Sequence, residues 1–138
     1  MRRIIFAAVT GSFAALIAPS ALQAQEEAPP PVGIARYYEC DITREARADT
    51  LVMEVIGPVY DRYLSEGKLV HWAWLAHYLG GKWRRLHTAY ATDPGDLLKT
   101  DDEIFAELWQ EHPEAFREFL LICPVHEDYI WTTRISRP

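Results

Sequence analysis

Hydrophobic positions divide the chain from residue 34 onward into short strand-like runs and longer helical stretches. Residues 34–42 (IARYYECDI) are rich in strand formers and follow a Pro–Gly break, which predicts a first strand. From Ala48 to Leu64 apolar residues recur at spacings of three and four, the period of one helix face. Pro58 lies inside this stretch and lacks a backbone donor, so we expect a kink there. Gly67 is suited to end the helix.

The next segment predicts a β-hairpin. Residues 68–79 and 82–91 both have strand composition, and Gly80-Gly81 separates them. Two strand-like runs joined by Gly-Gly are a strong hairpin pattern.

The last third of the chain predicts a second helical region and a fourth strand. Asp93-Pro94-Gly95 is a turn that opens a helical region, and Thr100 and Glu103 then have capping-box spacing. Pro113 interrupts the helical pattern, and residues 128–135 resemble a strand. The order strand, helix, strand, strand, helix, strand is the split pattern of ferredoxin-like domains. We therefore predict an α+β fold with a four-stranded antiparallel sheet and two helices on one face. Another α+β arrangement of the same elements is the alternative.

Both faces of the hairpin are apolar. With a two-residue turn, one face pairs Tyr78 with Trp83, Ala76 with Arg85, Trp74 with His87 and Trp72 with Ala89. The other face pairs His77 with Arg84, Leu75 with Leu86, Ala73 with Thr88 and His71 with Tyr90. We expect the leucine face to meet the helices, which leaves the tryptophan face outside. The reverse assignment exposes a leucine and tyrosine patch instead.

Either assignment leaves more apolar surface than two helices cover. Four large aromatic rings bury roughly 600–1000 Å² together, whereas monomers rarely expose more than a few hundred. The simplest cover is a second copy of the chain, because most soluble oligomers are two-fold homodimers. We predict a homodimer with facing sheets. A hydrophobic ligand or the N-terminal linker is the alternative cover.

The two cysteines provide a check on this topology. Cys40 lies near the end of the first predicted strand, and Cys123 lies just before the fourth. In the split pattern these strands are antiparallel neighbours, so the two cysteines meet at one corner and we predict a disulfide. Two unpaired buried thiols are the alternative.

The N-terminus has the layout of a secretory signal. Arg2 and Arg3 precede an apolar run from Ile4 to Ala18, and small residues around Ala24 suit a signal peptidase. The apolar run is shorter than the roughly 20 residues of a membrane-spanning helix, which disfavours an uncleaved anchor. We predict a signal peptide over 1–24, a Pro-rich linker over 25–33 and one domain over 34–138. The mature protein is then periplasmic or secreted.

The charge balance narrows the range of partners. The chain carries a formal net charge of −6, and removal of 1–24 takes away two arginines and no acidic residue, leaving −8. Phosphate binding needs basic surface, so a nucleic-acid partner is disfavoured. The same balance argues against adhesion to anionic lipid after signal cleavage.

The aromatic hairpin also carries the candidate site. Histidine exchanges protons near neutral pH and arginine holds anions, so we name His87 and Arg85 as candidate catalytic residues. Aromatic walls exclude water and stack on planar molecules, which makes the hairpin a candidate binding surface for a small apolar or aromatic ligand. Its candidate ligand-binding residues are Trp72, Trp74, Tyr78 and Trp83. Ordinary cross-strand packing is the competing interpretation of the same residues.

Motifs for other chemistries do not occur in the sequence. It contains no HExxH, no G-x-S-x-G and no phosphate-binding glycine loop. His71 and His77 lie six residues apart on one strand, about 20 Å at the usual rise, and cannot share a metal ion. We therefore expect no metal site and no cofactor, and a haem ligand among the histidines has no motif to support it.

The element order and the aromatic hairpin HWAWLAHYLGGKWRRLHTAY resemble the dimeric α+β barrel superfamily. That group includes small cofactor-free monooxygenases, stress-responsive barrels and some haem-handling enzymes. The resemblance covers about residues 34–137 and is architectural. It implies a cavity between sheet and helices or between sheets, without identifying the ligand. Three hypotheses follow: a ligand-binding homodimer, a monooxygenase or isomerase, and a protein-interaction module.

Overall fold

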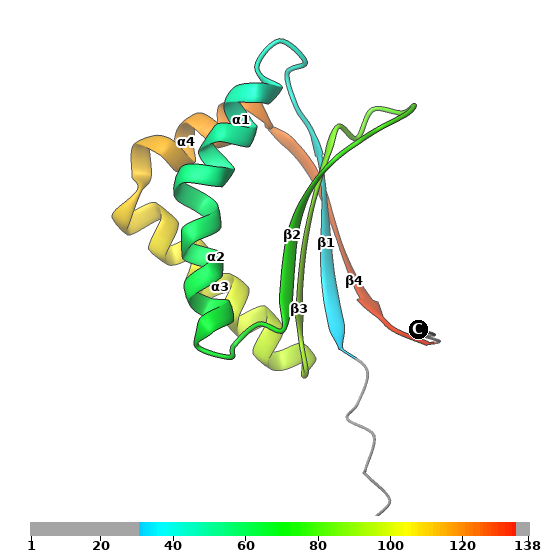
Figure 1. Ribbon diagram of the computed structural model, residues 1–138, viewed down its shortest axis with the longest axis vertical. Coiled ribbons are helices and arrows are strands. Elements are labelled where there is room, and N and C mark those ends of the chain that lie inside the picture. Colours follow the sequence, from blue (N-terminus) through cyan, green and yellow to red (C-terminus); the bar gives the residue numbers. More distant parts are fainter. Residues whose placement is uncertain (1–30, 135–138) are drawn as a thin grey trace, which may run out of the picture.

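The computed structural model describes residues 31–134, so the predicted signal peptide and most of the predicted linker lie outside the described residues. A four-stranded sheet forms one layer, and all the helices pack on one of its faces (Figure 1). The elements in order are β1 (Val32–Glu39), α1 (Glu45–Leu51), the π-helical turn η1 (Val52–Ile56), α2 (Gly57–Ser65), β2 (His71–Ala76), β3 (Arg85–Ala91), α3 (Pro94–Glu111), α4 (Pro113–Ile122) and β4 (Val125–Thr132).

The strand order confirms the predicted topology. The sheet runs β2-β3-β1-β4, and each neighbouring pair is antiparallel. The central strands β1 and β3 are the most buried, while β4 is exposed along its whole length. The arrangement is the ferredoxin-like fold with a helical layer over one face.

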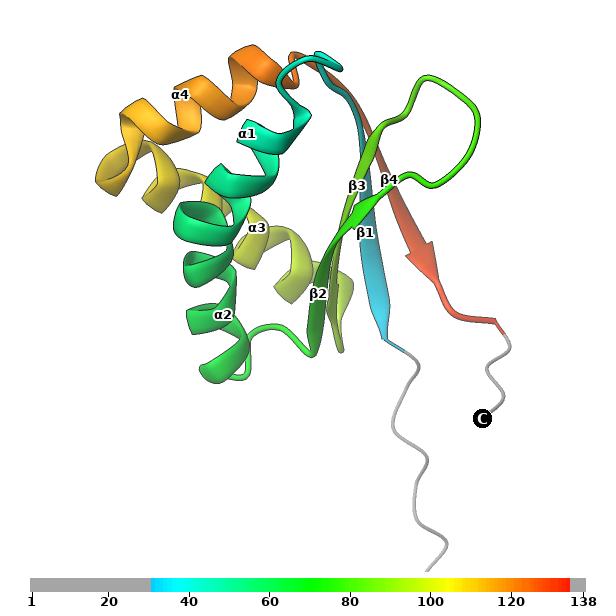
Figure 2. The same ribbon diagram turned by 45° about the horizontal axis from the view of Figure 1, so that its top comes forward.

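The hairpin has the predicted register but a longer loop. Trp74 pairs with His87, and the other predicted pairs from His71 to Ala76 also form. The ladder ends at Ala76, and residues 77–84 leave the sheet as a loop that bends away from the helices (Figures 1 and 2). Gly80 and Gly81 both have φ of 76°, a left-handed conformation that glycine adopts without strain.

The predicted orientation of the sheet was wrong. Trp72 and Trp74 face the helices, and the leucine face points outward. The reason is a pair of hydrogen bonds: Trp72 Nε1 donates to Asp61 Oδ1 and Trp74 Nε1 donates to Asp49 Oδ1, each at 2.8 Å. Both indoles are partly buried, and the helical layer supplies a hydrogen-bond acceptor for each indole N–H.

The first helical stretch departs from regular α-helix where a kink was predicted. Residues 52–56 form a π-helical turn, which ends two residues before Pro58. The stretch ends in a Schellman motif at Gly67, whose φ is 74°. Gly67 N donates to Leu64 O, and Lys68 N donates to Tyr63 O. The predicted role of Gly67 is thus confirmed.

Helix α3 opens at the predicted Asp93-Pro94-Gly95 turn, and the capping-box spacing of Thr100 and Glu103 lies inside the helix. Helix α3 begins at Pro94, and the Asp93 carboxylate caps it by accepting from the backbone N–H of Gly95 and Asp96. Thr100 is instead a buried residue within the helix. Asp93 precedes proline, which fits the first helical position, and this local pattern outweighs the later capping-box spacing.

The predicted disulfide forms at the predicted corner. Cys40 follows β1, Cys123 precedes β4, and their sulfurs are bonded. Asp41 N also donates to Ile122 O beside the bridge. The bond closes a loop of 83 residues that contains all the helices together with β2 and β3. Within residues 31–134 no helix is long and apolar enough to cross a membrane.

Candidate functional site

His87 is the central buried polar residue beneath the helices. It lies on β3 between Trp74 of β2 and Arg36 of β1, and only 4% of it is exposed. Its ring lies 4.5 Å from the Tyr60 ring, centre to centre. Neither ring nitrogen has a hydrogen-bond partner among the described residues. Burial, and then the charge of Arg36, lowers the pKa of His87 to about 3, so the ring is neutral at neutral pH.

A small cavity adjoins His87. Its volume is about 20 Å³, which is room for about one water molecule. The sheet contributes His87, Trp74 and Tyr38, and the helical layer closes the other side. Six of its lining side chains are aromatic: Tyr38, Tyr60, Trp74, Phe105, Phe116 and Phe119. We call this space the chamber.

The π-helical turn forms part of the chamber wall. Val52 and Ile56, its first and last residues, both line the chamber. A π turn widens the helix by one residue per turn and occurs frequently at functional sites. Gly57 comes directly after this turn and packs tightly against its backbone. A Cβ at position 57 would lie only 2.8 Å from Val52 O. The widened turn, Gly57 and Pro58 together set where Tyr60 enters the core.

Arg36 is buried next to the chamber but its charge is already neutralised. It is 3% exposed, and its Nε donates to Asp128 Oδ2 and its Nη2 to Asp101 Oδ2, each at 2.9 Å. The guanidinium also lies over the Phe105 ring at 4.7 Å. Asp128 Oδ1 also lies within hydrogen-bond distance of His126 Nδ1, at 2.8 Å. Two carboxylates therefore occupy the donors that an anionic ligand would need.

Arg85 is likewise held by acidic side chains of α1. Its Nε and Nη2 donate to the two oxygens of Asp49, both at 2.7 Å, and its Nη1 reaches Glu45 at 3.2 Å. Asp49 Oδ1, which accepts from Arg85 Nε, also accepts a hydrogen bond from Trp74 Nε1. The hydrogen bond from Arg85 lowers the pKa of the Asp49 carboxyl. This bidentate pair fixes the helix on the sheet and leaves Arg85 few free donors.

The sequence-predicted site residues are thus separated by the fold. His87 and Trp74 line the chamber, and Trp72 packs beside His87 with ring centres 6.2 Å apart. Tyr78 is 100% exposed on the loop after β2. Trp83 lies on the opposite side of the sheet, beside Tyr37.

Sequence reasoning missed Arg36, Tyr60 and the two aspartates around Arg36. One available signal was the alternation of the first strand, where Arg36 falls between Ile34 and Tyr38 on one face. A charged residue on the same strand face as two large apolar residues is a candidate for a buried ion pair. The partners Asp101 and Asp128 are 65 and 92 residues away in the sequence, and no local pattern joins them.

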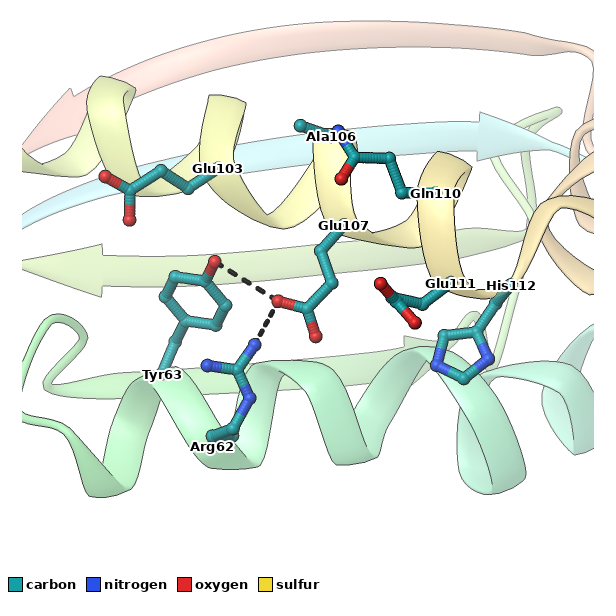
Figure 3. A pocket seen from close by; sticks show the side chains of 8 residues that line it. All are labelled: Arg62, Tyr63, Glu103, Ala106, Glu107, Gln110, Glu111 and His112. Carbon is teal, nitrogen blue, oxygen red and sulfur yellow. Dashed lines mark hydrogen bonds and ion pairs between the residues drawn. The ribbon is translucent and has the colours of Figure 1, made fainter.

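A larger groove lies between α2 and α3 (Figure 3). It measures about 670 Å³ and is lined by charged side chains, including Arg62, Glu103 and Glu107. Glu107 accepts from Arg62 and from the Tyr63 hydroxyl, and Lys68 pairs with Glu103 at 2.9 Å. These contacts tie the two helices together, so the groove is a solvated seam whose main charges are paired.

The side of the sheet away from the helices is apolar, and we call it the outer face. Leu75, Tyr129 and Trp131 are each about half exposed there. The Tyr37 ring lies 5.9 Å from Tyr129, and a hollow of about 230 Å³ opens beside Tyr37 and Leu75. Further outer-face side chains are Ala73, Trp83, Leu86, Thr88 and Tyr90. In residues 31–134 no cluster of three or more potential ligands could hold a metal ion.

No protein-family model matches the sequence, but solved structures share its architecture. A dimeric ferredoxin-like protein from an uncultured marine organism aligns with a TM-score of 0.60 and 11% identity, over 80% of this chain and 94% of that one. The chain has the ferredoxin-like fold. A NIPSNAP family protein from Agrobacterium tumefaciens aligns at 0.59 with 15% identity, over 78% and 90%. A second one from the same organism, of unknown function, aligns at 0.58 with 16% identity, over 81% and 95%.

These similarities confirm, at the level of fold, the resemblance to dimeric α+β barrels. The identities are too low to transfer an activity, because one fold supports many chemistries. The function must therefore be argued from the chamber and the outer face.

Proposed function

We propose that this protein is an exported homodimer that binds a small, neutral, mostly apolar molecule in the chamber of each protomer. His87 is the polar contact for that molecule. The observation that carries the proposal is the buried imidazole with two unpartnered nitrogens beside an aromatic cavity. A buried donor and acceptor without partners cost free energy, so the site favours a molecule that hydrogen-bonds to them.

The charges around the chamber support a neutral ligand. Arg36 is held by Asp101 and Asp128, and Arg85 is held by Asp49. An anionic ligand would have to displace one of these carboxylates from its arginine. A hydroxyl, carbonyl or nitrile group needs only the donor or acceptor that neutral His87 offers.

The low pKa of His87 supports binding over acid–base catalysis. A general base works best when its pKa lies near the operating pH. At about 3, His87 is far too weak a base for efficient proton abstraction at neutral pH. This favours ligand binding over the oxygenase or isomerase hypothesis, in which His87 and Arg85 were the acid–base and anion-holding groups.

The closed chamber requires the helical layer to open for anything larger than water. The chamber wall contains the π-helical turn and the Phe116 and Phe119 side chains of α4. Phenylalanine rings change rotamer without breaking hydrogen bonds, and a π turn can shift toward α-helix. We infer that ligand entry uses these two parts of the wall.

The outer face supports the homodimer. Contiguous exposed apolar patches of more than a few hundred Å² are rare on monomers and mark interfaces. Two of the similar structures are described as dimeric ferredoxin-like proteins. A two-fold axis over the outer face brings Leu75 and the tyrosine and tryptophan rings of β4 against the same patch of the partner.

The signal-like sequence of residues 1–24 and the Cys40–Cys123 disulfide support export. Stable disulfides persist in oxidising compartments and are rare in the cytosol. N-terminal sequencing of the purified mature protein tests the cleavage: a start near Gln25 is expected, and retention of Met1 contradicts it.

Ligand titration tests the chamber. We expect phenol to bind the wild-type protein, as measured by calorimetry or chemical-shift changes at His87, and benzoate to bind at least tenfold more weakly. His87→Phe should abolish phenol binding because it removes the polar contact and fills the cavity. His112→Phe, at the junction of α3 and α4, is the matched control and should bind phenol like the wild type. Equal binding of phenol by the His87→Phe variant would refute the site.

A further inference from the structure

The loop between β2 and β3 carries the two most exposed large apolar side chains in the described part of the chain. Tyr78 is 100% exposed and Leu79 is 87% exposed. Gly80 and Gly81 follow them, and apart from the adjacent residues of the loop no described atom would lie within 4 Å of a Cβ at either position. The loop tip therefore makes almost no contact with the rest of residues 31–134 in its own protomer.

The base of this loop is nevertheless held firmly. His77 N donates to Arg84 O at 3.1 Å, and Arg84 N donates to Tyr38 O at 2.8 Å. The Arg84 side chain donates to Glu45 at 2.6 Å. Lys82 lies over the Trp83 ring at 4.3 Å. The tip is thus presented from a fixed stem, which reduces the conformational entropy that its binding would cost.

The loop also projects in a particular direction. It bends away from the helical layer, toward the side of the outer face (Figures 1 and 2). Its stem borders the hollow of about 230 Å³, which is lined by His77 and Trp83 from the stem and by Tyr37, Leu75 and Leu86 from the sheet. The stem of the loop and the apolar outer face therefore border the same hollow.

We propose that residues 77–84 form an arm that packs Tyr78 and Leu79 against the outer face of a second copy of this chain. The inference rests on the homodimer proposed above. A partner that covers the outer face lies on the side toward which the arm projects, so the arm flanks it. In a two-fold dimer each protomer receives one arm and gives one.

The chemistry of the tip and of the outer face fits this occupant. The tyrosine ring alone offers roughly 150–250 Å² for burial, and aromatic residues are enriched at interface cores. The partner's outer face offers tyrosine, tryptophan and leucine side chains. Glu127 is a charged residue on this face, and its carboxylate accepts a hydrogen bond from the Tyr129 hydroxyl.

The dimer dissociation constant, measured by analytical ultracentrifugation, tests the arm. The arm variant is Tyr78→Ser/Leu79→Ser, and the control is Met53→Ser/Leu121→Ser, which removes two exposed apolar side chains from the helices. We expect at least tenfold weaker dimerisation for the arm variant and less than a twofold change for the control. Both variants should keep the wild-type circular dichroism, because all four side chains are exposed.

A third variant separates the arm from the dimer itself. Leu75→Arg places a charge on the outer face, at the hollow beside the stem of the loop, and should give a monomer. If the wild type is a dimer and Leu75→Arg is a monomer, an unchanged dissociation constant of the arm variant overturns the arm and leaves the dimer intact. If the wild type is a monomer, or Leu75→Arg remains a dimer, the outer-face dimer is overturned and the arm with it.

A photocrosslinker at position 78 gives an independent measurement. Benzoylphenylalanine there should produce covalent dimers whose crosslinked peptides derive from β3 or β4 of the other protomer. Crosslinks confined to the same protomer would contradict the arm even in a dimer.

Discussion

Replacement of His87 by phenylalanine should change how stability depends on pH. In the folded protein the pKa of His87 is about 3, whereas a solvated histidine has an ordinary value of 6.5. Between these two values the unfolded chain binds a proton that the folded chain does not. Stability contributed by the neutral buried ring is therefore complete above about pH 6.5 and is lost as the pH falls toward 3.

The magnitude follows from linkage. One proton taken up on unfolding corresponds to about 1.4 kcal/mol per pH unit within the window. From pH 7.5 to 4.5 the wild type should lose about 2–3 kcal/mol more than His87→Phe. At pH 7.5 the variant should be more stable than the wild type by about 1–2 kcal/mol, because two unpartnered buried nitrogens disappear and the small cavity is filled.

Urea unfolding at a fixed protein concentration from pH 4.5 to 7.5 measures both effects. The difference between the two stability curves isolates His87, since the carboxylates titrate in both proteins. His87→Gln is the control for polarity: it removes the same titration but keeps a buried polar group, so its curve should be equally flat and lower at pH 7.5. Parallel curves for the wild type and His87→Phe would show that His87 is not a neutral buried ring, and would refute the reasoning.

Three further predictions concern stability. Cys40→Ser/Cys123→Ser should lower the free energy of unfolding, measured in urea, by about 4 kcal/mol, because the bond constrains a loop of 83 residues in the unfolded chain. Thiol titration of the unfolded, unreduced wild type should find no free thiol. Gly57→Ala should lower the free energy of unfolding by about 1–3 kcal/mol, because the new Cβ would lie 2.8 Å from Val52 O. Helix propensity alone favours alanine by about 1 kcal/mol. A stabilised variant would therefore show that the π turn relaxes at little cost. Arg36→Met should cost about 3–5 kcal/mol at pH 7, because it leaves two aspartates without their cation. Burial raises the pKa of the Asp128 carboxyl, but hydrogen bonds from Arg36 and His126 lower it overall, so without Arg36 this carboxyl protonates at a higher pH and the cost should shrink in acid. A loss that is the same at neutral and acidic pH would contradict the ion-pair explanation.

Local sequence patterns determined much of the architecture. Apolar periodicity predicted the element order, and the Gly80-Gly81 pair predicted the hairpin register even though the ladder stops at Ala76. The topology placed Cys40 and Cys123 at one corner. These features could be predicted because they depend on residues close in sequence or on the few ways such elements pack.

The site could not be assigned from local pattern. Both hairpin faces are apolar, so hydrophobicity alone did not decide between them. Hydrogen bonds from the two indoles to Asp49 and Asp61, on a helix 11 to 25 residues earlier in the chain, favour the observed orientation. That orientation buries His87 and turns the leucine face outward.

What the sequence determined by itself is thus the order of elements, the strand register and the disulfide, which follow from periodicity and turn chemistry. Only the tertiary structure decided which face is covered, which charges surround Arg36, and that Tyr78 leaves the sheet on a projecting loop. These depend on partners distant in sequence, whose hydrogen bonds and burial form only when the helices pack on the sheet.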